Sequence, residues 1–130
     1  MREENLGVSK ARILIVEDEP NIAESLSFIL TRADFEVDAV ADAPEALDRL
    51  RRQSYAALVL DIMLPGMSGF DLLRMIRSDA ATAALPVLVL TAKGQSSDRR
   101  SAEELGASAF VTKPFSNADI VERLGRLVGT

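Results

Sequence analysis

Apolar and polar positions along the chain follow two alternating patterns. Short apolar runs at residues 13–16, 35–40, 57–60, 87–90 and 109–111 are separated by segments whose apolar residues recur at helical spacing. Five such repeats are typical of an α/β fold with a parallel sheet. Three of the runs are unbroken stretches of leucine and β-branched residues, which indicates strands covered on both faces, whereas run 35–40 is polar on alternate residues and is expected at an edge of the sheet.

The segments between these runs carry one apolar face each, as amphipathic helices do. The faces consist of Ile22, Leu26, Ile29 and Leu30; of Ala43, Ala46, Leu47 and Leu50; and of Ile120, Leu124, Leu127 and Val128. The helix-start signals are Pro20 and Pro44 in first turns, Asp42 three residues before Glu45, and Ser116 three residues before Asp119. The segment 96–106 differs, because it has only Ala102 and Leu105 to bury, so a helix there would shift easily.

Length and composition describe one compact domain. The 130 residues, of which 48% are hydrophobic and 27% charged, suffice for a single core but not for two ordinary domains. We expect the domain to occupy residues 11–130, after a flexible and charged segment at 1–10 that lacks the apolar stretch of a signal peptide.

Charge and residue types exclude several classes of function. The 15 Lys and Arg against 20 Asp and Glu give a net charge of -5, which opposes direct binding of nucleic acid or of an anionic membrane. The chain has no cysteine and no histidine, so disulfides, thiolate nucleophiles, Cys/His metal sites and imidazole bases are excluded. Carboxylates, hydroxyls and lysine remain as groups that could carry the chemistry. We expect the protein in the cytoplasm.

Polar residues stand where the predicted strands end. Glu17 and Asp18 follow the first strand, Asp61 ends the third, Thr91 ends the fourth and Lys113 follows the fifth. Because the carboxyl ends of parallel strands lie at one edge of a sheet, we expect these side chains to meet in one crevice. Three carboxylates together favour a hard cation such as Mg²⁺. An exposed aspartate beside it can attack a phosphoryl group, while Lys113 and Thr91 balance the charge.

Each residue taken singly also has a structural explanation. Acidic residues at 17–19 are favourable at any helix N-terminus, Thr91 suits a strand end, and Lys113 suits a surface. Asp61 is harder to explain in this way, since an apolar run precedes it and three apolar residues, 62–64, follow it. The coincidence of all these residues at one sheet edge favours the functional interpretation.

Four stretches of the chain are similar to the receiver domain of two-component response regulators. They are ILIVEDEP at 13–20, LVLDIMLPGMSG at 58–69, VLTA at 89–92 and KPF at 113–115, in family order and spacing. The resemblance covers residues 11–128. It implies a flavodoxin-like (βα)5 fold, a doubly wound parallel sheet with strand order 2-1-3-4-5.

The resemblance also implies roles for the residues at the sheet edge. Asp61 would be the phosphoacceptor, and Lys113 would contact the phosphate. Glu17, Asp18 and Asp61 would hold Mg²⁺ together with the backbone carbonyl of Met63. The protein would be a signalling domain rather than an enzyme, with at most Mg²⁺-dependent self-phosphorylation and autodephosphorylation.

The resemblance implies a conformational switch as well. Thr91 and Phe110 would form the switch pair, in which the hydroxyl moves toward the phosphoryl group and the ring follows it inward. Phe110 stands where the family often has tyrosine, so the ring can move by packing but cannot donate a tyrosine hydrogen bond. The Lys113–Pro114 peptide bond would be cis.

The partners follow from this resemblance. A sensor histidine kinase or a phosphotransfer protein would donate the phosphoryl group, and we expect it to dock at the first helix. The signal would leave through the face at 98–128, to a downstream protein or a second copy of the chain, without direct contact with nucleic acid or membrane.

Three other functions would need different features of the sequence. A phosphatase with an aspartyl nucleophile would need a carboxylate two residues after Asp61, where the chain has Met63. A flavin-binding protein would need a loop rich in Gly, Ser and Thr after the first strand, where the chain has the acidic residues 17–19. A receiver-like docking module that works without phosphorylation stays open, as does the choice between a stand-alone receiver and part of a longer regulator.

Overall fold

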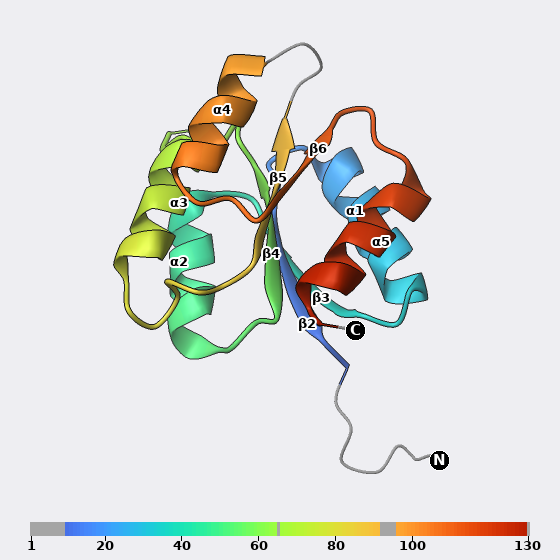
Figure 1. The fold of residues 1–130 in the computed structure, drawn as a ribbon. Helices are drawn as coiled ribbons and strands as arrows, with labels where there is room; N and C mark the ends of the chain where they lie inside the picture. The colour runs from blue at the N-terminus through green and yellow to red at the C-terminus, as the bar shows by residue number, and fades with distance from the viewer. Residues whose placement is uncertain (1–9, 65, 92–95, 130) are drawn as a thin grey trace.

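The computed structural model of the chain describes residues 10–64, 66–91 and 96–129. Of the segment 1–10, for which we predict flexibility, only Lys10 lies inside the described residues. Five strands and five helices alternate along this part of the chain (Figure 1). The strands are β2 (Arg12–Val16), β3 (Glu36–Val40), β4 (Ala57–Asp61), β5 (Val87–Thr91) and β6 (Ala109–Thr112). The helices are α1 (Pro20–Arg32), α2 (Ala43–Arg52), α3 (Gly69–Ser78), α4 (Ser96–Glu104) and α5 (Asn117–Leu127).

The five strands form one parallel sheet in the order β3-β2-β4-β5-β6. Counted along the chain this is 2-1-3-4-5, which confirms the predicted flavodoxin-like topology. β3 lies at one edge, as the alternating pattern of run 35–40 predicts. Helices α1 and α5 cover one face of the sheet, and α2, α3 and α4 cover the other (Figure 1).

The central strands are buried because both faces of the sheet are covered. Every residue of β4 and β5 is buried, and successive side chains enter opposite layers. Leu58 and Leu60 belong to the apolar cluster beneath α2 and α3, whereas Ala57 and Val59 belong to the cluster beneath α1 and α5.

The strand boundaries differ slightly from those predicted. Asp61 and Thr91 are the last residues of β4 and β5 and take part in the sheet. Phe35 lies outside β3, because its backbone N–H donates to the carbonyl of Leu30 at the end of α1, and the preceding Asp34 has a φ of 76°. The Phe35 N–H is therefore used in this turn and cannot donate to a neighbouring strand.

The predicted helix starts are present. The Asp42 and Ser116 side chains accept hydrogen bonds from the backbone N–H groups of Glu45 and Asp119, and the two prolines lie in first turns. In α4, Ala102 is fully buried and Leu105, just after the helix, is partly buried, as the composition of 96–106 predicts. Among the described residues, no helix is both long and apolar enough to cross a membrane.

Candidate functional site

The buried polar residues of the described chain all lie at the carboxyl edge of the sheet. They are Glu17, Asp61 and Thr91, with exposed fractions of 2%, 3% and 4%. Glu17 directly follows β2, and Asp61 and Thr91 end the adjacent strands β4 and β5. Burying polar side chains has a free-energy cost unless they find partners. Three of them together at one edge therefore indicate a functional site rather than ordinary packing.

Lys113 connects these residues. It follows β6, and its Nζ donates a hydrogen bond of 2.9 Å to Asp61 Oδ2 and lies 3.3 Å from Glu17 Oε1. Its backbone N–H donates to the Thr91 carbonyl at 2.8 Å. The structure therefore brings together residues that are separated by 52 positions in the sequence.

The exposure that we expect for Asp61 is not found. Oδ2 accepts the bond from Lys113, and Oδ1 accepts one from the backbone N–H of Met63 at 3.0 Å. Both oxygens thus have donors inside the protein, and these donors hold the carboxylate at the edge in one orientation. A molecule that reacts with the Asp61 carboxylate would have to displace, or share, the hydrogen bonds from Lys113 and Met63.

The acidic residues form a cluster with the geometry of a cation site. Glu17, Asp18 and Asp61 each place a carboxylate oxygen within 4.8 Å of the others. Glu17 Oε2 accepts a bond from the Glu19 N–H at 3.1 Å. Glu17 Oε1 is the one buried side-chain oxygen or nitrogen in the described part of the chain that has no hydrogen-bond partner. Its neighbour is the Lys113 ammonium at 3.3 Å, and a buried carboxylate oxygen without a hydrogen bond beside two other carboxylates suits a hard divalent cation.

Burial and the charges of this cluster shift two pKa values. Burial raises the pKa of Glu17 from 4.5 to about 7, and the nearby Asp61 adds to the rise. Burial alone lowers the pKa of Lys113, but its hydrogen bond and charge interaction with Asp61, together with Glu17, outweigh burial and raise it. The lysine therefore stays charged, while Glu17 is half protonated near neutral pH.

In buffer with a chelator of divalent metals, stability should fall as pH rises from about 4.5 to 7. In this range folded Glu17 keeps a proton that the unfolded chain has released. The groups that face Glu17 are Asp18, Asp61 and Lys113, and the chain has no histidine to mask the titration. The Glu17→Gln variant should escape this loss, which is about 1 to 3 kcal/mol. Urea unfolding from pH 5 to 8 measures it, and parallel curves for the two proteins would contradict the assignment.

Gly69, the first residue of α3, lets this helix approach the strand end that carries Asp61. Its N–H donates to the Ile62 carbonyl at 2.9 Å. A Cβ at this position would lie 2.7 Å from both the Asp61 carbonyl oxygen and the Ile62 Cα. These are backbone atoms of the site, so they cannot turn away as a flexible side chain would.

We expect Gly69→Ala to lower the free energy of unfolding by about 1 to 3 kcal/mol and to move the Asp61 backbone. The comparison variant is Gly66→Ala in the same loop, where no atom lies within 4 Å of the added Cβ and the cost is instead the backbone strain of a side chain at a φ of +75°. Amide resonances of residues 60–64 should shift clearly more in the Gly69 variant than in the Gly66 variant. Equal shifts would show that the close approach does not position the site.

The predicted switch residues lie on one face of the sheet. Phe110 on β6 is opposite Val89 on β5, and Thr91 follows Val89 by two residues. Paired residues of parallel strands point to the same side, as do residues two apart on one strand, so Thr91 and Phe110 are diagonal neighbours. Thr91 is buried and Phe110 is half-buried.

Two further expectations concern backbone groups. The Lys113–Pro114 peptide bond is cis, as the resemblance implies. The Met63 side chain is 67% exposed and its N–H faces Asp61, and the use of its carbonyl as a metal ligand stays a prediction.

Three residues with clear structural roles have no signal in the sequence pattern that identifies them. Gly69 is one glycine among several, and Arg77 and Arg99 belong to polar faces that look solvated. Arg77 donates to the carbonyls of Ala83, Leu85 and Gly106. The Arg99 guanidinium covers the ring of Phe110.

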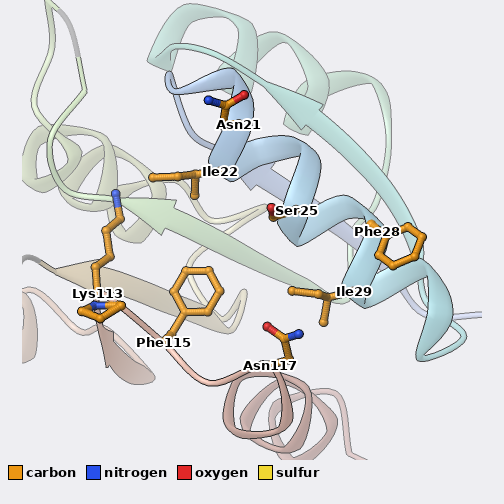
Figure 2. A pocket seen from close by; sticks show the side chains of 9 residues that line it. Asn21, Ile22, Ser25, Phe28, Ile29, Lys113, Phe115 and Asn117 are labelled. Carbon is orange, nitrogen blue, oxygen red and sulfur yellow. The ribbon is translucent and has the colours of Figure 1, made fainter.

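An apolar groove lies beside the acidic cluster, between α1 and the loop that leads into α5. It has a volume of about 700 Å³. Figure 2 shows the Phe115 ring between the loop and the Ile22 and Ile29 side chains of α1. Phe28, at the far end, is 63% exposed, and Lys113 forms the end nearest to Asp61.

Comparison with known proteins points to one family. The sequence profile of the response regulator receiver domain matches residues 13–125. The sensory transduction protein RegX3 of Mycolicibacterium smegmatis is 40% identical over 112 residues, which are 86% of this chain and 48% of RegX3. The phosphate regulon transcriptional regulatory protein PhoB of Klebsiella pneumoniae is 38% identical over 87% of this chain and 49% of its own length. The chain thus spans about half the length of these relatives.

Solved structures agree with the sequence comparison. A putative response regulator from Chloroflexus aurantiacus superposes with a TM-score of 0.91 and 34% identity, over 94% of this chain and all of that one. The receiver domain of a sensor histidine kinase from Pseudomonas aeruginosa, PA1611, gives a TM-score of 0.86 and 30% identity, over 94% of this chain and 100% of that one. That structure has a magnesium ion coordinated in its active site cleft.

Proposed function

The chain belongs to the response regulator receiver domain family, and from this premise we propose that Asp61 accepts a phosphoryl group from a phosphohistidine of a partner protein. The observation that carries the proposal is the position of the Asp61 carboxylate. It lies at the end of the central strand β4, bonded to the Lys113 ammonium at 2.9 Å and within 4.8 Å of the Glu17 and Asp18 oxygens.

The reaction is a direct transfer between two side chains. A carboxylate oxygen of Asp61 forms a bond to phosphorus, and the bond between phosphorus and the histidine nitrogen breaks. The histidine keeps the electron pair of that bond and takes a proton from solvent. Lys113, already hydrogen-bonded to Asp61, stabilises the negative charge of the phosphoryl oxygens, and the Thr91 hydroxyl offers them a further donor.

The acidic cluster fits a magnesium ion. Glu17, Asp18 and Asp61 would hold it, with the Met63 carbonyl as a further ligand. Glu17 Oε1 supports this assignment, because this buried oxygen accepts no hydrogen bond from the described residues and has the Lys113 ammonium beside it at 3.3 Å. When bound, Mg²⁺ supplies positive charge next to the transferring phosphoryl oxygens.

The donor protein would be a sensor histidine kinase or a phosphotransfer protein that docks along α1. The groove beside α1 supports this site, since Lys113 belongs both to its lining and to the contacts of Asp61. An apolar helix face seated against Phe28 and Phe115 would place a histidine near the sheet edge (Figure 2). The partly exposed Phe28 ring is an anchor of the kind that such interfaces use.

The signal would leave through the face at 98–128, toward a downstream protein or a second copy of the chain. A phosphoryl group on Asp61 would attract the Thr91 hydroxyl, and Phe110 would follow into the space that Thr91 leaves. With a net charge of -5, this chain is not expected to contact nucleic acid or membrane itself. The proposed location is the cytoplasm.

Intact-mass measurement tests the proposal. The purified chain is mixed with acetyl phosphate, or with a cognate phosphorylated kinase, and Mg²⁺. We expect the mass of one phosphoryl group to appear and to disappear again after removal of the donor, because aspartyl phosphates hydrolyse. Failure of the wild-type chain to gain this mass from either donor would contradict the proposal.

A further inference from the structure

Arg99 of α4 covers the ring of the switch residue Phe110. Its guanidinium carbon lies 5.0 Å from the ring centre, which is within the distance at which a cation is attracted to an aromatic face. Phe110 is half-buried and packs from β6 against the apolar cluster beneath α2 and α3. The stack therefore joins α4 to the strand that carries the switch ring.

Among the side chains of α4 that the structure describes, few others attach the helix to the sheet. Its residues are strongly polar, and Ala102 is the fully buried apolar residue among its described side chains. The neighbouring Arg100 is exposed and makes no ion pair or ring contact with any described residue. A helix with so little buried apolar surface moves at a small free-energy cost.

The C-terminal end of α4, in contrast, is fixed. The N–H groups of Gly106 and Ala107 donate to the carbonyls of Glu103 and Ala102, which closes the helix in a Schellman motif. Gly106 has a φ of 93°, as this motif requires. Arg77 of α3 donates two hydrogen bonds to the Gly106 carbonyl, from Nε at 3.0 Å and from Nη2 at 2.8 Å.

Arg77 also forms hydrogen bonds with the segment between α3 and β5. Its Nη1 donates to the carbonyls of Leu85 at 2.7 Å and Ala83 at 3.2 Å. One guanidinium on α3 thus ties the turn after α4 to two backbone carbonyls of the segment between α3 and β5. This turn is a natural pivot, because it stays in place when the first half of the helix moves.

We propose that the Arg99–Phe110 stack is a latch that couples α4 to the position of the switch ring. While Phe110 lies under Arg99, the first half of α4 is held against β6. When the ring moves toward Thr91, the guanidinium loses its aromatic face, and α4 swings about the turn at Gly106 that Arg77 fixes. This inference rests on the proposed switch, and it names the residue that transmits the switch to the output face.

The latch has a thermodynamic consequence. The Arg99–Phe110 contact exists only while the ring lies under Arg99. It therefore stabilises that arrangement against the one in which the ring has moved toward Thr91, which phosphorylation favours. Its removal should therefore strengthen binding of any ligand selective for the other arrangement by about two- to fivefold, which corresponds to an exposed cation–π contact. The same removal should loosen the first half of α4.

Two variants of the full chain test the latch. Arg99→Ala removes the stack, and Arg100→Ala is the matched control, with the same truncation at the next position on the same helix. The first measurement is the dissociation constant of beryllofluoride, a phosphoryl analogue, by calorimetry in saturating Mg²⁺. The second is amide hydrogen exchange along α4 in the absence of the analogue.

We expect Arg99→Ala to bind beryllofluoride about two- to fivefold more tightly than wild type. Amides of residues 100–102, which in a helix bond to the carbonyls of residues 96–98 in the first half of α4, should exchange faster in this variant. Those of Gly106 and Ala107 should stay as protected as in wild type. The Arg100→Ala control should match wild type in both measurements. If Arg99→Ala also matches wild type, or loosens Gly106 and Ala107 as much as the helix, the latch is wrong.

The two measurements separate this inference from the proposed function. If wild type does not bind beryllofluoride at all, phosphoryl acceptance at Asp61 is contradicted. Hydrogen exchange needs no ligand and still decides whether Arg99 restrains α4.

Discussion

Asp61→Asn is expected to abolish phosphorylation of the chain by acetyl phosphate and by a histidine kinase. The amide has no anionic oxygen to attack phosphorus, and the neighbouring carboxylates cannot replace it. Glu17 lies farther from the Lys113 ammonium, at 3.3 Å, and burial raises the pKa of its carboxyl, which favours the protonated form. The Lys113 ammonium lies closer to Asp61, at 2.9 Å, than to Glu17, at 3.3 Å, so the charge-balancing group is directed at the Asp61 carboxylate.

Intact-mass analysis of the Asp61→Asn variant checks this prediction. Asp48→Asn is the matched control, since Asp48 lies on the surface of α2 and pairs only with Arg52 among the described residues. The control should gain one phosphoryl group like wild type, and far-ultraviolet circular dichroism should show both variants folded. Phosphorylation of Asp61→Asn at the wild-type level would remove Asp61 from its proposed role.

The layered fold could be predicted from local patterns because each strand and helix has a clear period. The alternating polarity of run 35–40 predicts an edge strand, and β3 is at the edge. The scarcity of apolar residues in 96–106 predicts a weakly packed α4, and Ala102 is its buried contact. The order of the strands came instead from the family resemblance, since periodicity alone does not say which strands pair.

The site could be predicted as a set of residues but not in its detailed contacts. Strand ends identify Asp61 and Lys113, yet the contact between them is a hydrogen bond across 52 positions, which no local pattern contains. Glu17 and Asp18 are adjacent in sequence, but one is buried and the other exposed. The direction in which the chain leaves β2 decides this difference, and it is a property of the tertiary structure.

The same limit applies to the groups that hold α4. Arg77 and Arg99 have the composition of a solvated surface, and a single sequence gives no reason to separate them from Arg100. Their roles depend on what lies opposite: a turn 29 positions away for Arg77 and an aromatic ring for Arg99. Only the packed structure brings these partners together.

Lys113 supplies the positive charge at the acidic edge of the sheet, so its substitution should also have a large effect. Its ammonium contacts the two most deeply buried carboxylates, Glu17 and Asp61, at 3.3 and 2.9 Å. Its own side chain is 23% exposed. Removal of one partner from a buried ion pair leaves an uncompensated charge, which typically costs about 3 to 5 kcal/mol. Glu17 can relieve part of this cost by taking up a proton, and more so at low pH.

We therefore expect Lys113→Met to lose about 3 kcal/mol of stability near pH 7.5 in chelating buffer, and less near pH 5. Added Mg²⁺ should stabilise wild type, by relieving repulsion among the three carboxylates, and should stabilise the variant more, because no ammonium shares that task. The control Lys10→Met removes an exposed lysine that lies 3.2 Å from Asp34, and it should stay within about 0.5 kcal/mol of wild type. Urea unfolding at several Mg²⁺ concentrations measures these differences. If unfolding of neither wild type nor Lys113→Met responds to Mg²⁺ up to tens of millimolar, a range above the affinity of such half-open sites, the acidic cluster does not bind the metal.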